Sequence, residues 1–238
     1  MMTVGLLGGM SWESTVPYYR TINRIVGQRL GGLHSAKIAV YSVDFHDIEE
    51  LQRSGRWTEA GGILVEAARA LERAGADFLV LCTNTMHKVA PQIEAAIDLP
   101  LLHIADATAA RIKAAGLKRV GLLGTRFTME EDFYRGRLED LHGLEIVVPP
   151  AEQRTIVHRV IYDELCRGAV REDSRSAYRR IVSGLIRQGA EGVILGCTEI
   201  GLLLHEGDAD VPLFDTAEIH AEEAARWALA GYPDRAPR

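Results

Sequence analysis

The sequence repeats itself in three places, in the same order and at nearly the same spacing. VGLLGG at 4–9 recurs as VGLLGT at 120–125, a shift of 116 positions. LVLCTN at 79–84 aligns with VILGCTE at 193–199, which places Cys82 and Cys197 115 positions apart. LPLLHIADAT at 99–108 resembles VPLFDTA at 211–217, a shift of 112. Similarity among buried strands explains the apolar runs but not a Cys-Thr pair at one fixed point, so we interpret the pattern as an internal duplication.

Short apolar runs alternate with longer stretches of helical periodicity. Runs of four to seven β-branched and leucine residues are typical of strands covered on both faces. We predict strands near 3–7, 37–43, 78–82, 100–104, 119–124, 145–148, 192–196 and 212–214. We predict helices near 14–29, 58–74, 85–97, 106–115, 129–141, 152–167, 172–189 and 216–230. This alternation indicates an α/β protein with mainly parallel sheets and right-handed crossovers.

Helix ends are marked by a few residues. Ser14 or Thr15 is expected to cap the first helix, with Pro17 in its first turn, where proline is tolerated. Gly75 is expected to end the helix at 58–74.

The duplication predicts two similar, pseudo-symmetric three-layer α/β domains. We expect one domain to comprise 1–103 and 215–238, and the other 104–214. Ligands of open α/β sheets bind beyond the carboxyl ends of the strands. If the domains face each other at those ends, the active site lies in the cleft between them, and Cys82 and Cys197 meet across it.

Composition excludes several classes of function. The 238 residues carry a net charge of −6, which argues against a nucleic-acid or anionic-membrane partner, because such partners need clustered Lys and Arg. No apolar run is long enough to span a membrane, and the N-terminus lacks the basic region of a signal peptide. Three cysteines without a CxxC pair form neither a disulfide framework nor a zinc knuckle. A reducing, cytoplasmic location is expected.

Cys82 and Cys197 each stand between a predicted strand and a predicted helix. A helix N-terminus favours the thiolate, which can act as a nucleophile or accept a proton. Mirrored positions favour proton transfer: one thiolate removes a proton from carbon, and a thiol on the other face returns one. The product is the opposite stereoisomer.

Polar residues surround both cysteines and suit a substrate carboxylate. They supply hydroxyls, an amide and the N–H groups of a helix start. These residues are Thr83, Asn84, Thr85, Thr125 and Thr198. Stabilising the enediolate-like form of that carboxylate would be their electrostatic contribution.

Other candidates have plainer interpretations. Cys166 has no repeated partner, so we expect it to pack a helix. His87, His103 and His220 lack the spacing of metal ligands, and we expect structural or supporting roles and no bound metal. GLLGGM is not a GxGxxG fingerprint, and no phosphate-binding loop accompanies Lys88, so neither a nucleotide nor pyridoxal phosphate is expected.

At these residues the chain resembles the aspartate/glutamate racemase superfamily. The segments GLLGGMSWEST, LCTNTMHK, LHIADAT, LLGTRFTMEEDFYRGRL, GCTEIGLLL and FDTAEIHAE are similar to the aspartate-racemase branch, and most similar to its broad-specificity amino-acid racemases. The resemblance covers nearly the whole chain. It implies two pseudo-symmetric α/β domains, an amino-acid substrate, catalysis without cofactor or metal, and an assembly that can be a homodimer.

The resemblance also implies roles for individual residues. Cys197 would act on the L-enantiomer and Cys82 on the D-enantiomer. Met10 and Gln52 would lie near the substrate side chain, and Glu199 stands where glutamate racemases usually have His. Some aspartate racemases hold the distal carboxylate with a basic pair. Here the corresponding stretches offer Gln52, Arg53 and Arg167 but no Lys, so polar neutral substrates such as homoserine stand beside aspartate and glutamate.

Three alternatives to an amino-acid racemase remain. A hydantoin- or maleate-type isomerase uses the same scaffold, and maleate isomerisation also uses two cysteines. A decarboxylase of this fold has a single cysteine, which the matched pair argues against. A non-catalytic amino-acid-binding protein would be stabilised by its ligand without exchanging the α-proton.

Overall fold

The apolar runs form two parallel sheets that share one strand order. The computed structural model describes residues 1–231, and its sheets have the orders β2-β1-β3-β4 and β6-β5-β7-β8. The strands are β1 (Val4–Gly8), β2 (Ile38–Ser42), β3 (Phe78–Leu81), β4 (Leu101–Leu102), β5 (Arg119–Gly124), β6 (Glu145–Val147), β7 (Val193–Gly196) and β8 (Leu213–Asp215). Every pairing in both sheets is parallel. The eight predicted strands are confirmed, each end to within two residues.

The chain divides into two compact units, each built on one sheet. The first holds residues 1–103 and takes the chain up again at His220; the second is Ile104–Ile219. The return to the first unit falls inside helix α9 (Thr216–Ala228), whereas the sequence placed it at residue 215. Because β1, β2, β3 and β4 occupy the same sheet positions as β5, β6, β7 and β8, the strand orders agree with the internal repeat.

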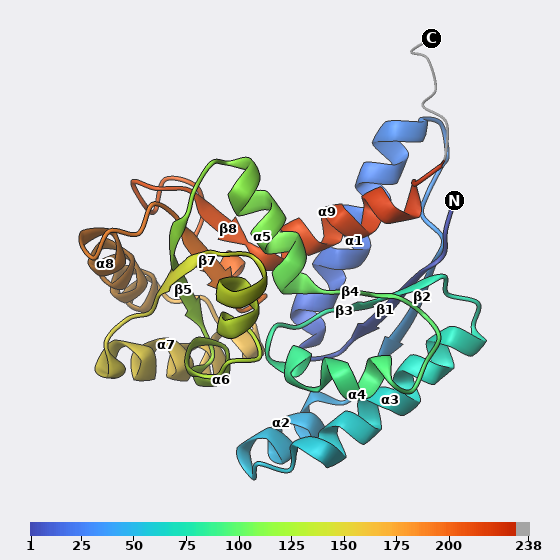
Figure 1. The fold of residues 1–238 in the computed structure, drawn as a ribbon, viewed down its shortest axis with the longest axis horizontal. Coiled ribbons are helices and arrows are strands. Elements are labelled where there is room, and N and C mark those ends of the chain that lie inside the picture. The colour runs from blue at the N-terminus through green and yellow to red at the C-terminus, as the bar shows by residue number, and fades with distance from the viewer. Residues whose placement is uncertain (232–238) are drawn as a thin grey trace. The chain divides into compact units, whose positions relative to one another are not determined.

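Helices cover both faces of the first sheet (Figure 1). They are α1 (Trp12–Leu30), α2 (Phe45–Arg53), α3 (Trp57–Arg73), the 3-10 helix η1 (Thr85–Val89), α4 (Ala90–Glu94) and the later part of α9. Successive strand residues point to opposite faces. Leu79 packs in the cluster that includes α3, while Phe78 lies 5.4 Å from Trp227 of α9 between ring centroids. The first unit is therefore a three-layer α/β structure.

Two details of the first unit differ from the sequence prediction. Ser11 is the N-cap residue of α1, and the hydroxyls of Ser14 and Thr15 instead donate to the Ser11 carbonyl from inside the helix. Pro17 accordingly lies beyond the first turn. Gly75, with φ of +81°, ends α3 as expected.

Helix α2 was not predicted. Its start is marked by Asp44, whose side chain accepts a hydrogen bond from the backbone N–H of His46 at 3.0 Å. Ile48 and Leu51 are its only buried apolar residues, and two positions are too few to reveal a helical period. Also, the predicted helix at 85–97 is the pair η1 and α4, so the turn after Cys82 leads into a short 3-10 segment.

The helices of the second unit are α5 (Ile104–Ala114), α6 (Arg126–Glu130), the π-helix η2 (Arg137–Leu141), α7 (Ala151–Asp163), the 3-10 helix η3 (Leu165–Arg167), α8 (Glu172–Arg187) and the 3-10 helix η4 (Ile200–Leu202). Helices α7 and α8 follow β6. Gly121 of β5 faces Leu185 of α8 so closely that an added Cβ would collide with it. The predicted continuous helix at 129–141 is wrong. The backbone becomes extended at Glu131, with ψ of 151°, and Tyr134 is fully buried, so packing overrides the helical pattern.

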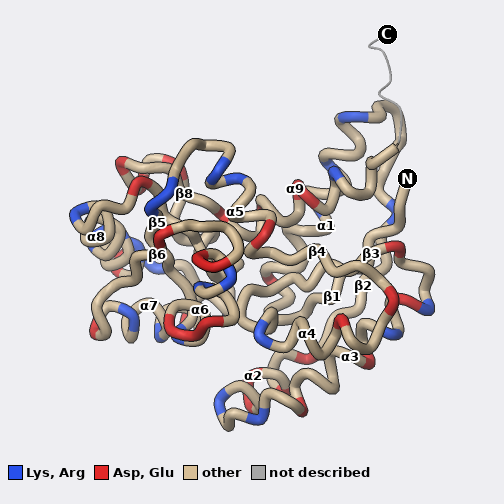
Figure 2. The backbone as a smooth tube through the Cα atoms, viewed as in Figure 1, with Lys and Arg blue, Asp and Glu red and all other residues tan. Residues whose placement is uncertain are grey.

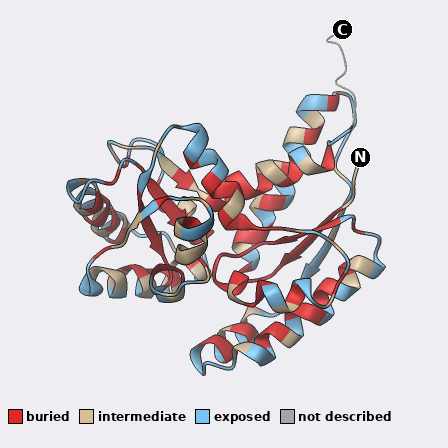
Figure 3. Ribbon diagram, viewed as in Figure 1, coloured by how far each residue is buried: buried red, intermediate tan, exposed pale blue. Residues whose placement is uncertain are grey.

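Burial and charge follow the layers. Figure 3 shows the inner strands β1, β3, β5 and β7 buried, and every residue of β1, β3 and β7 is so. Figure 2 shows Lys and Arg interspersed with Asp and Glu over the helices. None of the helices within residues 1–231 combines the length and apolar character needed to cross a membrane.

Candidate active site

Cys82 begins the turn that follows β3 in the first unit. Its backbone N–H donates to the Leu7 carbonyl at 2.9 Å, which continues the pairing of β3 with β1 by one residue. Its side chain is fully buried, and Sγ contacts the Val80 carbonyl at 3.6 Å. Burial raises the pKa of the Cys82 thiol. The protein therefore favours a thiol at Cys82, not the thiolate expected from a helix N-terminus, because the desolvation is strong and the following helix is short.

The polar residues that follow Cys82 lie in the same buried turn. The side chains of Thr83, Asn84 and Thr85 are each less than a tenth exposed. The backbone N–H of His87 donates to the Asn84 carbonyl at 3.1 Å, which closes the turn into η1. These hydroxyls and this amide are thus grouped around the carboxyl end of β3.

Met10 and Gln52 lie in the same unit, and Gln52 reaches this turn. Both are buried, Met10 after the end of β1 and Gln52 in the last turn of α2. The Gln52 amide Nε2 lies 3.0 Å from Sδ of Met86, the residue after Thr85. Met10 belongs to the same apolar cluster as Met86. The unpredicted helix α2 is therefore what brings Gln52 to the Cys82 turn.

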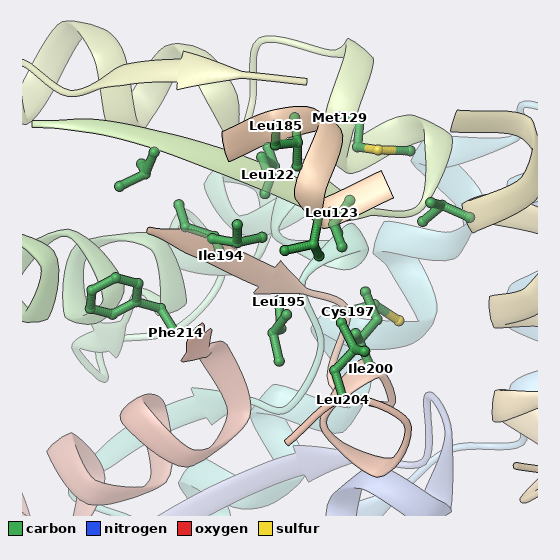
Figure 4. Packing of buried hydrophobic residues seen from close by; sticks show 14 of the residues in the cluster. Leu122, Leu123, Met129, Leu185, Ile194, Leu195, Cys197, Ile200, Leu204 and Phe214 are labelled. Atoms are coloured by element: carbon green, nitrogen blue, oxygen red, sulfur yellow. The ribbon is translucent and has the colours of Figure 1, made fainter. Parts of the chain in front are cut away.

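Cys197 takes the corresponding position after β7 in the second unit. Figure 4 shows it beyond the end of β7, beside Ile200 and Leu204 of one apolar cluster. Its Sγ lies 3.0 Å from Oε2 of Glu199, and the Thr198 hydroxyl donates to the same oxygen at 2.9 Å. Glu199 is itself buried. Burial, and after it the Glu199 charge, raises the pKa of the Cys197 thiol well above its ordinary value.

Thr125 stands beside Cys197 because their strands are neighbours. Gly124 of β5 is paired with Gly196 of β7, so the residues that follow them, Thr125 and Cys197, leave the sheet at the same edge. The Thr125 hydroxyl caps α6 by accepting a bond from the Thr128 N–H at 3.3 Å. The predicted set therefore gathers at the carboxyl ends of two strands in each unit.

Asp215 is a partly buried acid in the second unit that the sequence analysis did not single out. It ends β8, and its Oδ1 accepts bonds from the N–H groups of Ala217 and Glu218 at 2.9 and 3.1 Å. Burial raises its pKa to about 6 despite these bonds. Its carboxylate fills the space where a side chain at Gly201 would lie. The sequence did carry a signal, since FDTAE places Asp215 directly before the first residue of α9, Thr216, which is the position of an N-cap.

Cys166 also lies nearer to this site than expected. It packs against the second unit's core, and after burial the Glu199 charge contributes to raising its thiol pKa. All three cysteines are free. Within residues 1–231, no group of three His, Cys, Asp or Glu side chains is arranged to hold a metal ion.

The sequence profile described as Asp/Glu/Hydantoin racemase matches residues 7–224. A curated relative, the broad-specificity amino-acid racemase RacX of Bacillus subtilis (strain 168), is 23% identical over 95% of this chain and 98% of its own length.

Solved structures of similar fold include two at higher identity. A candidate Asp/Glu racemase from Yersinia pestis is 59% identical, with a TM-score of 0.89 over 96% of this chain and all of its own. PH1733, an aspartate racemase homologue from Pyrococcus horikoshii OT3, is 37% identical, with a TM-score of 0.82 over 96% of this chain and 99% of its own.

Proposed function

Because the chain belongs to the Asp/Glu/Hydantoin racemase family, we propose that it interconverts L- and D-amino acids by moving the α-proton between Cys82 and Cys197. Family membership makes it an amino-acid racemase, an isomerase. The observation that supports the mechanism is the equivalence of the two thiols. Cys82 directly follows β3 and Cys197 directly follows β7, which hold the same place in their sheets, and each cysteine is followed by threonine.

The proposed step is balanced in protons. A thiolate of one cysteine takes the α-proton and becomes a thiol, and the substrate becomes an enediolate-like carbanion. The thiol of the other cysteine gives its proton to the opposite face and becomes a thiolate. Exchange with solvent resets the pair. Backbone and side-chain donors of the two turns would stabilise the developing charge on the substrate carboxylate.

Forming the first thiolate needs help, since burial raises the pKa of both thiols. Glu199 is placed to supply it on one side, because its Oε2 is 3.0 Å from Cys197 Sγ, within reach of the thiol proton. We assign Glu199 the role of base for Cys197, in addition to a place beside the substrate. Cys82 has no carboxylate at the matching position, where Asn84 stands.

Substrates of this reaction would be aspartate, glutamate or polar neutral amino acids such as homoserine. The neighbourhood of Gln52 supports the neutral class, because this side chain is buried, uncharged and bonded to a thioether. The breadth named for the Bacillus subtilis relative is consistent with it.

Proton NMR in D2O tests the reaction. The purified protein, without pyridoxal phosphate and with reductant, is mixed with single-enantiomer amino acids, and the α-proton signal is followed. Loss of the signal together with appearance of the other enantiomer is the expected result. Exchange of the proton of a hydantoin, without exchange in free amino acids, would show that hydantoins are the substrates. Thermal stabilisation by amino acids without any exchange would identify a binding protein instead.

We also propose that the protein forms homodimers. Trp12, Val16 and Tyr19 lie on one flank of α1 and are 61%, 44% and 54% exposed. Aromatic residues of this kind are enriched in protein interfaces. Sedimentation of the wild type at micromolar concentration is expected to give a dimer, and a Trp12→Glu variant to shift toward monomer. A monomeric wild type would contradict the proposal.

A cytoplasmic location is proposed on the basis of the free thiols. None of the three cysteines forms a disulfide, and the proposed mechanism requires two of them as thiols. Fractionation of cells that express the tagged chain tests this, with recovery outside the cytoplasmic fraction as the contrary result.

A further inference from the structure

Three buried histidines from separate segments meet in the first unit. They are His87 of η1, His103 after β4 and His220 of α9. The ring centroid of His87 lies 4.3 Å from that of His103 and 6.1 Å from that of His220. They form no metal site within the described residues. Buried polar rings of this kind need another explanation, since each must satisfy its nitrogens inside the protein.

His220 ties three elements together in a defined protonation state. Its Nε2 is 2.8 Å from the Leu102 carbonyl, and a carbonyl only accepts, so Nε2 carries the hydrogen. Burial lowers the pKa of His220 to about 4, and the ring is neutral at pH 7. Its Nδ1 therefore accepts from the Tyr18 hydroxyl, 2.9 Å away. Helices α1 and α9 are thereby joined to β4, and Leu102 of β4 pairs with Val80, the residue whose carbonyl contacts Cys82 Sγ.

Of the three histidines, His87 makes the contact that lies nearest to Cys82 along the chain. Its Nδ1 lies 2.7 Å from the Thr83 carbonyl, so by the same logic Nδ1 carries the hydrogen and donates it. Thr83 directly follows Cys82. The Cys82 peptide is thus held on one side by the Leu7 carbonyl and on the other through Thr83 by His87. The neighbouring rings of His103 and His220 limit the freedom of the His87 ring to turn away.

We infer that His87 is a positioning residue for Cys82: its Nδ1–H fixes the Thr83 carbonyl and so the turn that presents the Cys82 thiol. This inference rests on the proposed role of Cys82 as an acid and base. Only the Cys82 turn has a histidine at this position of the repeat. Five positions after Cys197, where the repeat would place a partner for His87, stands Leu202. Loss of the His87 donor should therefore affect the Cys82 half of the reaction and spare the Cys197 half.

The test uses two substitutions at His87 and a control. His87→Phe keeps a ring but removes the donor, and His87→Asn restores an N–H close to the position of Nδ1. His34→Phe is the control, since His34 is an exposed histidine of the same unit. Exchange of the α-proton in D2O is measured separately from the D- and the L-enantiomer of the best substrate. We expect His87→Phe to slow exchange from the D-enantiomer at least tenfold and from the L-enantiomer less than threefold. His87→Asn should regain most of the loss, and the control should match the wild type.

A second readout does not depend on activity. Alkylation by iodoacetamide is followed for each cysteine by peptide mass spectrometry. A loosened turn should make Cys82 react at least threefold faster in His87→Phe, with Cys166 and Cys197 unchanged. Equal acceleration at all three cysteines, with equal loss for both enantiomers, would show that His87 only supports the fold and would overturn the inference. Unchanged Cys82 reactivity and exchange would also overturn it. If the wild type exchanges neither enantiomer, the proposed function fails, while the Cys82-selective alkylation still decides whether His87 holds the turn.

Discussion

The Sγ of Cys197 and Oε2 of Glu199 are 3.0 Å apart, both inside the protein, whereas Sγ of Cys82 contacts the backbone carbonyl of Val80 at 3.6 Å. The thiols of the two repeats therefore have the same place in the sheet but different surroundings. A racemase must run in both directions, and in the proposed mechanism each direction begins at a different cysteine. The two half-reactions are expected to respond differently to substitution and to pH.

Glu199→Gln should lower the pKa of Cys197, because it removes a buried negative charge that opposes the thiolate. The midpoint of Cys197 alkylation against pH is expected to fall by about one unit or more, with the Cys82 profile as internal control. Exchange from the L-enantiomer should nevertheless drop roughly a hundredfold, since the base is lost. Unchanged alkylation of Cys197 would argue against the contact.

Asp208→Asn should destabilise the second unit. The buried Asp208 side chain accepts bonds from Arg175 at 2.8 Å and from the His205 N–H at 2.9 Å, and it pairs with Arg179. These partners hold its pKa well below its usual range although burial opposes this. We expect the free energy of unfolding in urea at pH 7 to fall by about 2–3 kcal/mol.

The pH dependence of that difference has a definite sign. A carboxylate with a lowered pKa stabilises the folded protein above its unfolded pKa, and the contribution is lost as the pH falls below about 4. The gap between wild type and Asp208→Asn should therefore narrow in acid. Asp210→Asn, an exposed residue of the same loop, should change stability by less than about 0.5 kcal/mol. A similar loss in both variants would contradict the assignment.

His220 should make the protein sensitive to mild acid. Its pKa of about 4 in the folded protein lies below the ordinary 6.5, so the unfolded chain binds the proton first as the pH falls. Between pH 6.5 and 4 this costs up to about 3 kcal/mol of stability. His220→Gln keeps a donor for Leu102 but cannot titrate.

Comparing the wild type with His220→Gln isolates the effect of protonating His220. Asp215, with its pKa raised to about 6, acts in the opposite sense over the same range, but it is present in both. Urea unfolding at several pH values should show a steeper decline for the wild type. Parallel curves would mean that His220 is not neutral in the folded protein.

The sequence predicted the sheets better than their connections. Repeated apolar runs around Leu6, Leu79 and Ile194 identify strands, because a parallel strand that is covered on both faces is a nearly continuous apolar run. Helix α2 and the break near Glu131 were not predicted, because α2 buries few apolar residues and the break follows from the packing of Tyr134. Helix α2 carries the predicted site residue Gln52.

The sequence proposes residues for the candidate site but does not reveal their contacts. The matched Cys-Thr pairs single out Cys82 and Cys197 as candidates from the repeat alone. The sequence suggested a helix dipole that favours thiolates, but burial outweighs it at both cysteines. The bond between Glu199 and Cys197 and the link from His87 to Thr83 depend on side-chain directions that no spacing reveals.

The most direct test of the account is α-proton exchange in D2O by Cys82→Ser and Cys197→Ser, started from each pure enantiomer. The account predicts that neither variant racemises at an appreciable rate. Cys82→Ser should still exchange the α-proton of the L-enantiomer without inverting it, and Cys197→Ser that of the D-enantiomer. Full racemisation by either variant would contradict the two-thiol mechanism.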